Sequence, residues 1–417
     1  MTAAVLEGAV ASDPVSRLGL GIAIILVAAK LGGEVAIRLK QSSVLGELLA
    51  GILLGTLPLR FFTEMRVDPY VDMLARLGVL VLLFQVGLES TVREVVQVGG
   101  PSAAVAVLGT VGTLVAAGAA AVLALPHASL LVQAFVAASM TATSIGISAR
   151  VLRDSGASRR REAHAILGAS VIDDVIGLVV LAILTGIVAH RATGAALTPW
   201  CVVWLVVKTL GFLALAIVLG MRLSGPLFRL TARLRGSGAL LATGLSFCFV
   251  LAWASNAIGL SPIVGAFTAG LILEESHSAT FVERGEPSLA ERMEPISAWL
   301  VPMFFVLMGM RADLRALLHP QTLLLAAVLT AGALVGKLAC ALGAPRGTDR
   351  LAVAFGMLPR GEVSLVFANL GLSMAILDGG QYSALVTAVV LTTLVTPAAL
   401  RSRLARTSQA GRPVPDG

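Results

Sequence analysis

Two adjacent carboxylates, Asp173 and Asp174, lie in the middle of an apolar run that extends from Ala165 to Leu184. An ionised side chain at hydrocarbon depth costs about 3 kcal/mol or more, so such a residue needs a basic partner, an ion or a proton. Neighbouring residues of a helix point about 100° apart, because one turn takes 3.6 residues. We therefore expect the two carboxylates to have different partners and not to form a single clamp.

Lys337 is the candidate partner for this pair, because it is the one basic residue deep in the apolar stretch 321–343. A lysine buried near a carboxylate has a pKa that its surroundings can move. Such an ion pair could form when a protonated lysine meets an ionised aspartate, and break when a cation takes the carboxylate. The pattern indicates competition between protons and cations. The alternative is a lysine whose long side chain reaches the membrane surface.

Two other apolar stretches carry helix breakers near their middle. The segment 139–146 is rich in hydroxyl side chains, which compete for backbone hydrogen bonds. The segment 356–362 contains a proline and a glycine that interrupt a helix. If 42–190 and 259–400 are two units of opposite orientation, each break falls in the fourth helix of its unit. Paired interrupted helices at matching places predict the binding site of a transporter.

The two breaks also carry polar side chains that can bind or balance an ion. Hard cations prefer oxygen ligands, which carboxylates, hydroxyls and freed carbonyls supply. The first break offers Thr141, Thr143 and Ser144. In the second break, Arg360 and Glu362 either neutralise each other or pair with the ends of the broken helices.

Composition places the chain in a membrane. Of its 417 residues, 57% are hydrophobic and 13% are charged, whereas a soluble domain carries about 25% charged residues. The apolar runs are long and do not alternate with period two, which favours helices over a barrel.

Basic residues at cytoplasmic helix ends explain the net charge of +7, so we expect no nucleic-acid partner. The three cysteines lack metal spacing, and we expect no cofactor.

The apolar pattern predicts an all-α polytopic membrane protein of about thirteen transmembrane helices. Of the lysines and arginines, 20 fall on the side of the C-terminus and 6 on the other side, which predicts an outer N-terminus and a cytoplasmic C-terminus. We expect a disordered polar tail after the last helix and a local pair of Lys30 with Glu34. The predicted helices are 17–38, 42–59, 70–89, 101–125, 129–153, 162–190, 199–222, 237–255, 259–275, 288–310, 321–343, 350–374 and 380–400.

Six motifs follow one another along the chain: Ser43–Gly55, Leu82–Glu89, Thr141–Leu152, Gly168–Leu178, Gly336-Lys337 and Pro359–Glu362. In these motifs the chain resembles the cation–proton antiporter superfamily, in particular its electrogenic, aspartate-pair sodium/proton branch of the NapA type. The resemblance implies inverted five-helix repeats with crossed broken helices, a homodimer in the lipid of the cell membrane, and a transporter with no enzymatic activity.

The resemblance also implies roles for single residues. Asp174 would alternately bind Na⁺ and protons, and so act as the ligand of the monovalent cation. Asp173 would pair with Lys337, with Thr143 and Ser144 close to the site. An aspartate pair with a lysine implies exchange of two protons for one sodium ion. The residues expected to support the broken helices are Thr141, Arg360 and Glu362.

A mobile core domain and a dimerisation domain are a further implication of the resemblance. An elevator movement of the core would carry the site across the membrane. The implied division is a dimerisation domain of 1–100 and 223–315, a core of 101–195 and 316–402, a linker helix at 196–222 and a cytoplasmic tail at 403–417.

Other transport functions compete with sodium/proton antiport. A channel needs a continuous pore with filter loops or charged rings, and the sequence offers neither. A sodium-coupled symporter of an organic solute needs a larger polar cavity. A potassium/proton antiporter of the same fold stays open, because these residue types do not separate Na⁺, Li⁺ and K⁺.

Overall fold

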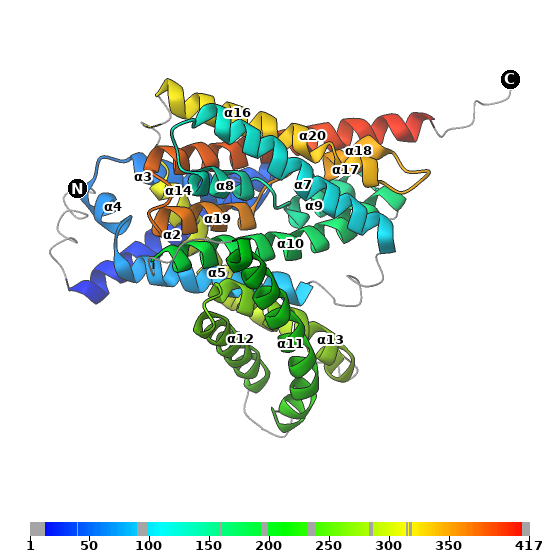
Figure 1. The fold of residues 1–417 in the computed structure, drawn as a ribbon. Coiled ribbons are helices and arrows are strands. Elements are labelled where there is room, and N and C mark those ends of the chain that lie inside the picture. Colours follow the sequence, from blue (N-terminus) through cyan, green and yellow to red (C-terminus); the bar gives the residue numbers. More distant parts are fainter. Residues whose placement is uncertain are drawn as a thin grey trace.

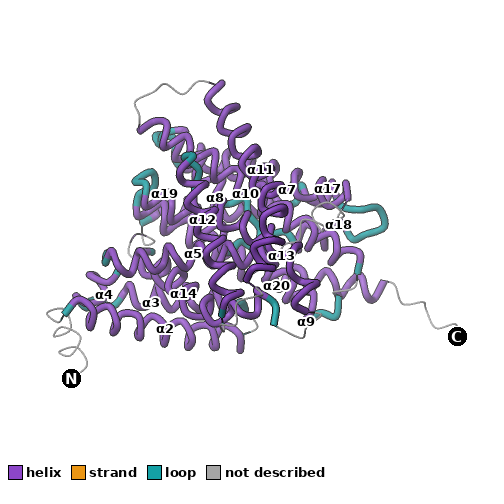
Figure 2. The backbone as a smooth tube through the Cα atoms, turned by 90° about the horizontal axis from the view of Figure 1, so that it is seen from below, coloured by secondary structure: helices purple, strands orange, loops and turns teal. Residues whose placement is uncertain are grey.

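The computed structural model describes residues 13–39, 41–89, 99–157, 160–192, 199–231, 238–282, 287–313, 316 and 319–410. Within these ranges all regular structure is helical (Figures 1 and 2). Nine helices of the described chain are long and apolar enough to cross a membrane, and four further apolar helices are shorter. The all-α membrane architecture is confirmed, while the count of thirteen spans stays a prediction.

Each predicted range contains at least one helix, and one short helix, α4, was not predicted. The helices are α2 (Pro14–Arg38), α3 (Ser43–Thr56), α4 (Arg60–Met65), α5 (Pro69–Glu89), α7 (Gly99–Ala124), α8 (Leu130–Ser139), α9 (Ile145–Asp154), α10 (Arg161–Ala192), α11 (Pro199–Thr231), α12 (Ala239–Ala257), α13 (Pro262–Val282), α14 (Leu289–Arg311), α16 (Pro320–Lys337), α17 (Cys340–Gly343), α18 (Arg350–Gly356), α19 (Glu362–Ser373) and α20 (Gly379–Ala410).

Most of the helix packing falls within two groups. In one group, α3 packs on α2 and α14, α5 packs on α13 and α14, and α12 packs on α13. In the other group, α7 packs on α8, α10 and α16, and α16 packs on α20. Helix α11 contacts α13 of the first group and α10 of the second (Figure 1). The helix that carries the two aspartates, α10, therefore belongs to the second group.

Both predicted helix breaks are present, and they touch. Helix α8 ends at Ser139 and α9 begins at Ile145, while α18 ends at Gly356 and α19 begins at Glu362. Between the two breaks, the Ser144 amide donates a hydrogen bond of 2.8 Å to the Pro359 carbonyl. Carbonyls at the ends of α8 and α18 and amides at the starts of α9 and α19, which lack partners within their own helices, therefore lie at one crossing.

A third interruption was not predicted, in the stretch 321–343 that the sequence suggests is one helix. Helix α16 ends at Lys337, and the short α17 begins at Cys340. The amides of Leu338 and Ala339 donate to carbonyls only three residues back, so the last turn is tightened. Lys337 is thus the final residue of α16, where the negative end of the helix dipole favours a cation.

Two local expectations are wrong. Helix α20 continues to Ala410, so residues 403–410 are helical, while 411–417 lie outside the described residues. The extension is held by Arg403, whose Nε lies 2.8 Å from Oδ2 of Asp349. Glu34 pairs with Arg38 at 2.9 Å and not with Lys30, because a glutamate four residues before a basic residue is the better orientation on a helix.

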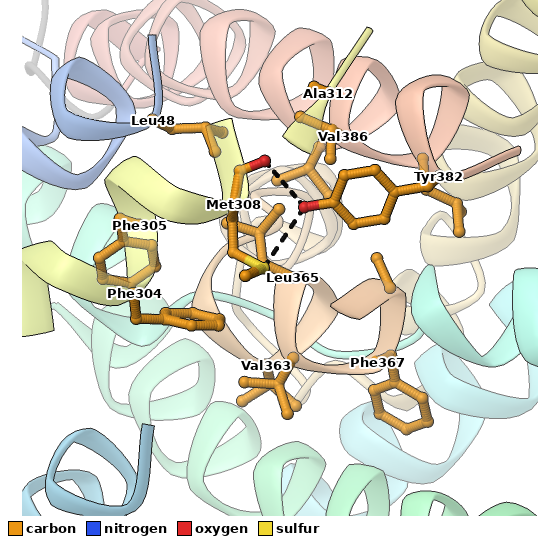
Figure 3. Close-up of a cluster of buried hydrophobic side chains, with 14 of the residues drawn as sticks. Leu48, Phe304, Phe305, Met308, Ala312, Val363, Leu365, Phe367, Tyr382 and Val386 are labelled. Carbon is orange, nitrogen blue, oxygen red and sulfur yellow. Dashed lines mark hydrogen bonds between the residues drawn. The ribbon is translucent and has the colours of Figure 1, made fainter. Parts of the chain in front are cut away.

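A buried cluster of side chains joins α14 to α19 and α20 (Figure 3). The hydroxyl of Tyr382 donates to the Met308 carbonyl at 2.8 Å and lies 3.3 Å from the Met308 sulfur. Leu365 and Phe304 pack in the same cluster (Figure 3). Met308 lies in the last turn of α14, where carbonyls lack a helical donor. Tyr382, on α20 of the second packing group, therefore donates a hydrogen bond to a carbonyl of α14, in the first packing group.

Further polar contacts tie the end of α14 to the second group. Nη1 of Arg311 donates to Oδ1 of Asn369 at 3.0 Å, and its Nη2 pairs with Asp72 on α5. Just after α14, the Asp313 amide donates to Oγ of Ser383 at 2.9 Å. At this end of the molecule the two packing groups are thus held together by hydrogen bonds as well as by apolar contact.

Close packing of α16 on α7 requires small residues, and this gives a first testable prediction. A Cβ added at Gly336 would lie 2.5 Å from Cα of Thr113 and 2.7 Å from the Gly112 oxygen. Gly336→Ala therefore forces the helices apart, and such overpacking costs about 1–3 kcal/mol. We expect a lower thermal unfolding midpoint of the purified protein.

Gly211→Ala on α11 is the matched control, because a Cβ there meets no atom within 4 Å outside its own helical surroundings. Its midpoint should equal or exceed that of the wild type, since alanine favours a helix over glycine. Equal midpoints for the two variants would contradict the packing described for α16 and α7.

Candidate ion-binding site

Asp173 is fully buried on α10 and has several hydrogen-bond donors. The Thr143 amide donates to Oδ2 at 2.9 Å, and the Thr110 hydroxyl donates to Oδ1. The ammonium of Lys337 lies 3.0 Å from Oδ1 and 2.9 Å from Oδ2. Asp173 and Lys337 are both 0% exposed, so this ion pair is screened from solvent. The Asp173 carboxylate is therefore held by Thr110 on α7, by Lys337 on α16 and by Thr143 in the first break.

Small residues on α7 make room for the lysine. A Cβ added at Gly109 would lie 3.3 Å from Cδ of Lys337 and 2.3 Å from Sγ of Cys340. Only a residue without a side chain fits at that position while α16 stays in contact with α7. The backbone of α7 thus lies close enough for Lys337 to reach α10.

Asp174 is the neighbour of Asp173 in sequence but has different surroundings. Its side chain is buried, with 4% exposure. Its Oδ1 atom is buried and receives no hydrogen bond from any residue that the structure describes. Buried polar atoms without a partner are rare and cost free energy, so each such atom calls for a functional explanation. The step of about 100° between neighbours separates Asp173, whose two oxygens both accept hydrogen bonds, from Asp174, whose Oδ1 has no donor among the described residues.

The crossing of the two breaks is built by hydroxyl groups. Oγ1 of Thr143 donates to the Met357 carbonyl at 3.1 Å, and Oγ of Ser144 donates to Oε2 of Glu362 at 3.3 Å. A Cβ added at Gly361 would lie 2.7 Å from Oγ of Ser144. Glycine at position 361 therefore permits the close approach of the second break to the first.

Arg360 is buried with 0% exposure and donates to backbone carbonyls of the first break and of α16. Its Nη1 donates to the carbonyls of Thr141 and Ala142 at 3.3 Å each, and its Nη2 donates to the Ala333 carbonyl at 3.4 Å. Glu362 is the first residue of α19, at the positive end of that helix. The described contacts do not join this pair to each other: the Arg360 guanidinium contacts backbone carbonyls, and Glu362, at the start of α19, contacts Ser144.

The predicted residues play unequal parts in this arrangement. Asp173, Lys337 and Thr143 are brought into direct contact, and Ser144 contacts Glu362. The Thr141 hydroxyl donates to the Ala138 carbonyl of α8, the preceding helix, at 2.7 Å, so only the Thr141 backbone carbonyl contacts the second break.

Two contacts at the site were not predicted from the sequence. Thr110 donates to Asp173, and Oγ1 of Thr393 on α20 donates to the Arg360 carbonyl at 2.6 Å. Neither residue is charged, and threonine is common in apolar helices. Their roles follow from which helices meet, for which the sequence alone gives no local signal.

A buried carboxylate pair beside two touching helix breaks, within an all-helical membrane fold, is the arrangement of a secondary transporter. The chain belongs to the family described as "Sodium/hydrogen exchanger, transmembrane", whose family model matches residues 22–405. Membership of the cation–proton antiporter superfamily is thereby confirmed, and the protein is a transporter and not an enzyme. The NapA-type branch stays a prediction.

Curated relatives match nearly the whole chain. The "High-affinity Na(+)/H(+) antiporter NhaS3" of Synechocystis sp. (strain ATCC 27184 / PCC 6803 / Kazusa) is 34% identical, over 92% of this chain and 89% of the relative. The "Na(+)/H(+)-K(+) antiporter GerN" of Bacillus cereus is 32% identical, over 91% of this chain and 94% of the relative.

Among solved structures, that of the sodium proton antiporter MjNhaP1 from Methanocaldococcus jannaschii matches with a TM-score of 0.70. The match covers 94% of this chain and 99% of the other at 15% sequence identity. At this identity the likeness establishes a shared fold.

The buried ion pair gives a second testable prediction. Lys337→Met keeps the length of the side chain and leaves the Asp173 carboxylate buried without its cation, which costs about 3–5 kcal/mol. We expect a clear drop in the thermal unfolding midpoint. Removing both charges in Asp173→Asn/Lys337→Met should recover much of that loss.

Lys30→Met serves as the control, because Lys30 is exposed on α2. Its midpoint should stay near that of the wild type. A double variant less stable than Lys337→Met would show that the two charges do not compensate each other.

Proposed function

We propose that the protein is a secondary active antiporter that exchanges Na⁺, or Li⁺, for H⁺ across the cytoplasmic membrane. The observation that carries the proposal is the contrast between neighbouring buried carboxylates. Asp173 has donors from Thr110, Thr143 and Lys337, whereas Oδ1 of Asp174 has none among the described residues. Membership of the exchanger family and the Na(+)/H(+) names of NhaS3 and GerN support the choice of ions.

In this proposal, Asp174 holds a cation or a proton but not both. Either one neutralises the carboxylate, and a neutral site crosses the membrane at a lower cost than an ionised one. The oxygens of Thr143, Ser144 and Glu362 at the crossing are the further candidate ligands. Because Asp174 crosses the membrane only with a cation or a proton bound, movement of one ion in one direction is coupled to movement of the other ion in the opposite direction.

Lys337 provides the proposed second proton. When a cation at Asp174 also takes the Asp173 carboxylate, it replaces the ammonium of Lys337 as the counter-charge of Asp173, and the lysine can release a proton. Two protons would then exchange for one Na⁺, so that each cycle moves one net positive charge. Transport by this scheme is electrogenic.

Alternating access would arise from movement of one packing group against the other. The second group, with α7–α10 and α16–α20, contains both breaks and the ion pair and would be the mobile core. The first group, with α2–α5 and α12–α14, would form the homodimer, and α11 would link the two. The Tyr382–Met308 and Arg311–Asn369 hydrogen bonds between the groups would break during the cycle. The N-terminus would lie outside and the C-terminus in the cytoplasm.

A second candidate is potassium/proton antiport by the same site. The printed name of GerN, a relative over 91% of this chain, includes K(+) as well as Na(+). The two functions differ only in the cation that competes for Asp174. Transport assays with each chloride salt distinguish them.

Asp174→Asn removes the exchangeable charge and should abolish exchange. The assay is the collapse of a pH gradient in proteoliposomes, followed with a pH-sensitive dye after addition of Na⁺, Li⁺ or K⁺. A change at Lys30, such as Lys30→Gln, should leave exchange unaltered. Exchange near the wild-type rate in Asp174→Asn would remove Asp174 from the central role.

Competition for one carboxylate predicts a defined pH dependence. Lowering the pH should raise the apparent KM for Na⁺, approaching about tenfold per pH unit where one proton occupies the site. The maximal rate should depend on an imposed membrane voltage, since net charge moves. A KM that does not vary with pH would contradict competition at Asp174, and voltage-independent exchange would contradict the two-proton scheme.

A further inference from the structure

A cavity of about 530 Å³ lies away from the aspartate pair, between α10, α11 and the turn that joins α12 to α13. Gly186 and His190 line it from α10, and Gly259 lines it from the turn. Gly186 is twelve residues beyond Asp174, about 18 Å along the helix. The cavity is therefore separate from the candidate ion-binding site. We call it the α10–α11 groove.

The α11 side of this groove faces the surroundings of the protein. Trp200 and Trp204 line it and are 74% and 59% exposed. They are one turn apart, and Lys208 follows after one more turn on the same face of the helix. Around them, Val203, Val207 and other apolar side chains of α11 are exposed. In a membrane protein such a face contacts lipid, and tryptophan is enriched where the lipid meets water.

Lys208 gives the groove a positive charge. Its ammonium lies beside the α12–α13 turn, where a Cβ added at Gly259 would be 3.3 Å from Nζ. No aspartate or glutamate lines the groove. In the parts of the chain that the structure describes, no carboxylate forms an ion pair with Lys208. A cation within the apolar segment Val203–Leu227 needs compensation from elsewhere.

We propose that the α10–α11 groove binds an anionic phospholipid, with the headgroup phosphate on Lys208 beside the tryptophans. An acyl chain would run along the exposed apolar side chains of α11 beyond Lys208, such as Leu215. The open apolar side of the groove selects a lipid, because a soluble anion gains nothing from Trp204 or Leu205. The uncompensated ammonium selects an anionic headgroup. A zwitterionic headgroup carries a cation of its own, which Lys208 repels.

The groove lies where the two packing groups meet, so that a bound lipid would contact both. Helix α10 belongs to the packing group that carries Asp173 and Asp174, while the α12–α13 turn belongs to the other group. A lipid in the groove would touch both groups beside α11. The inference does not depend on which ion the protein transports.

Native mass spectrometry of the purified protein tests the proposal, with phosphatidylglycerol and phosphatidylcholine as probes. The wild type and Lys208→Arg should retain phosphatidylglycerol, and Lys208→Gln should reduce its occupancy about fivefold, the effect of one basic residue near an anionic headgroup. Lys30→Gln changes an exposed lysine on α2, away from the groove, and should behave as the wild type. Equal occupancy in Lys208→Gln, or equal retention of phosphatidylcholine by the wild type, would overturn the proposal.

The same spectra examine a second copy of the chain as the other possible occupant. Trp204→Leu should weaken phosphatidylglycerol retention and leave the distribution of monomers and dimers unchanged. A shift toward monomers in Trp204→Leu or Lys208→Gln would identify the face as an interface between copies and overturn lipid binding. Unchanged thermal unfolding midpoints of the variants exclude loss of fold as the cause.

Discussion

The cost of keeping a charge inside an apolar helix bundle constrains this whole structure. Asp173 and Lys337 meet that constraint together, because each is fully buried and neutralises the other at 2.9 Å. Their contact requires α7, α10 and α16 to pack closely, which glycines such as Gly109 and Gly336 permit. Removing one partner would leave a buried charge that the apolar surroundings cannot stabilise. The pair thereby fixes the helix that carries Asp174.

The two interrupted helices provide partners for the other buried charges and for the free backbone groups. The carbonyls of Thr141 and Ala142, in the break after α8, accept hydrogen bonds from Arg360, and Glu362 lies at the positive start of α19. Backbone freed from helical hydrogen bonds is tolerated at membrane depth only where protein or an ion satisfies it. Here the two breaks satisfy each other through the contact of Ser144 with Pro359. One oxygen of Asp174 remains beside them without a donor among the described residues.

The sequence predicted this site to the extent that its residues stand out from an apolar background. The aspartate pair, Lys337 and the two breaks are visible because charges, proline and clustered hydroxyls are rare in such runs. Thr110 and Thr393 could not be predicted, because a single threonine in an apolar helix is ordinary until its neighbours in space are known. The end of α16 at Lys337 depends likewise on packing against α7. The domain movement, the dimer and the residue roles stay proposals.

Equilibrium Na⁺ binding tests the central claim most directly, because it separates the two carboxylates without requiring transport. Isothermal titration calorimetry of the purified protein should give a binding signal for the wild type and none for Asp174→Asn. In Asp173→Asn/Lys337→Met, where the structural pair is neutral, the signal should persist. Na⁺ binding that survives in Asp174→Asn and is lost only with the Asp173–Lys337 pair would contradict the assignment of Asp174 as the exchangeable carboxylate.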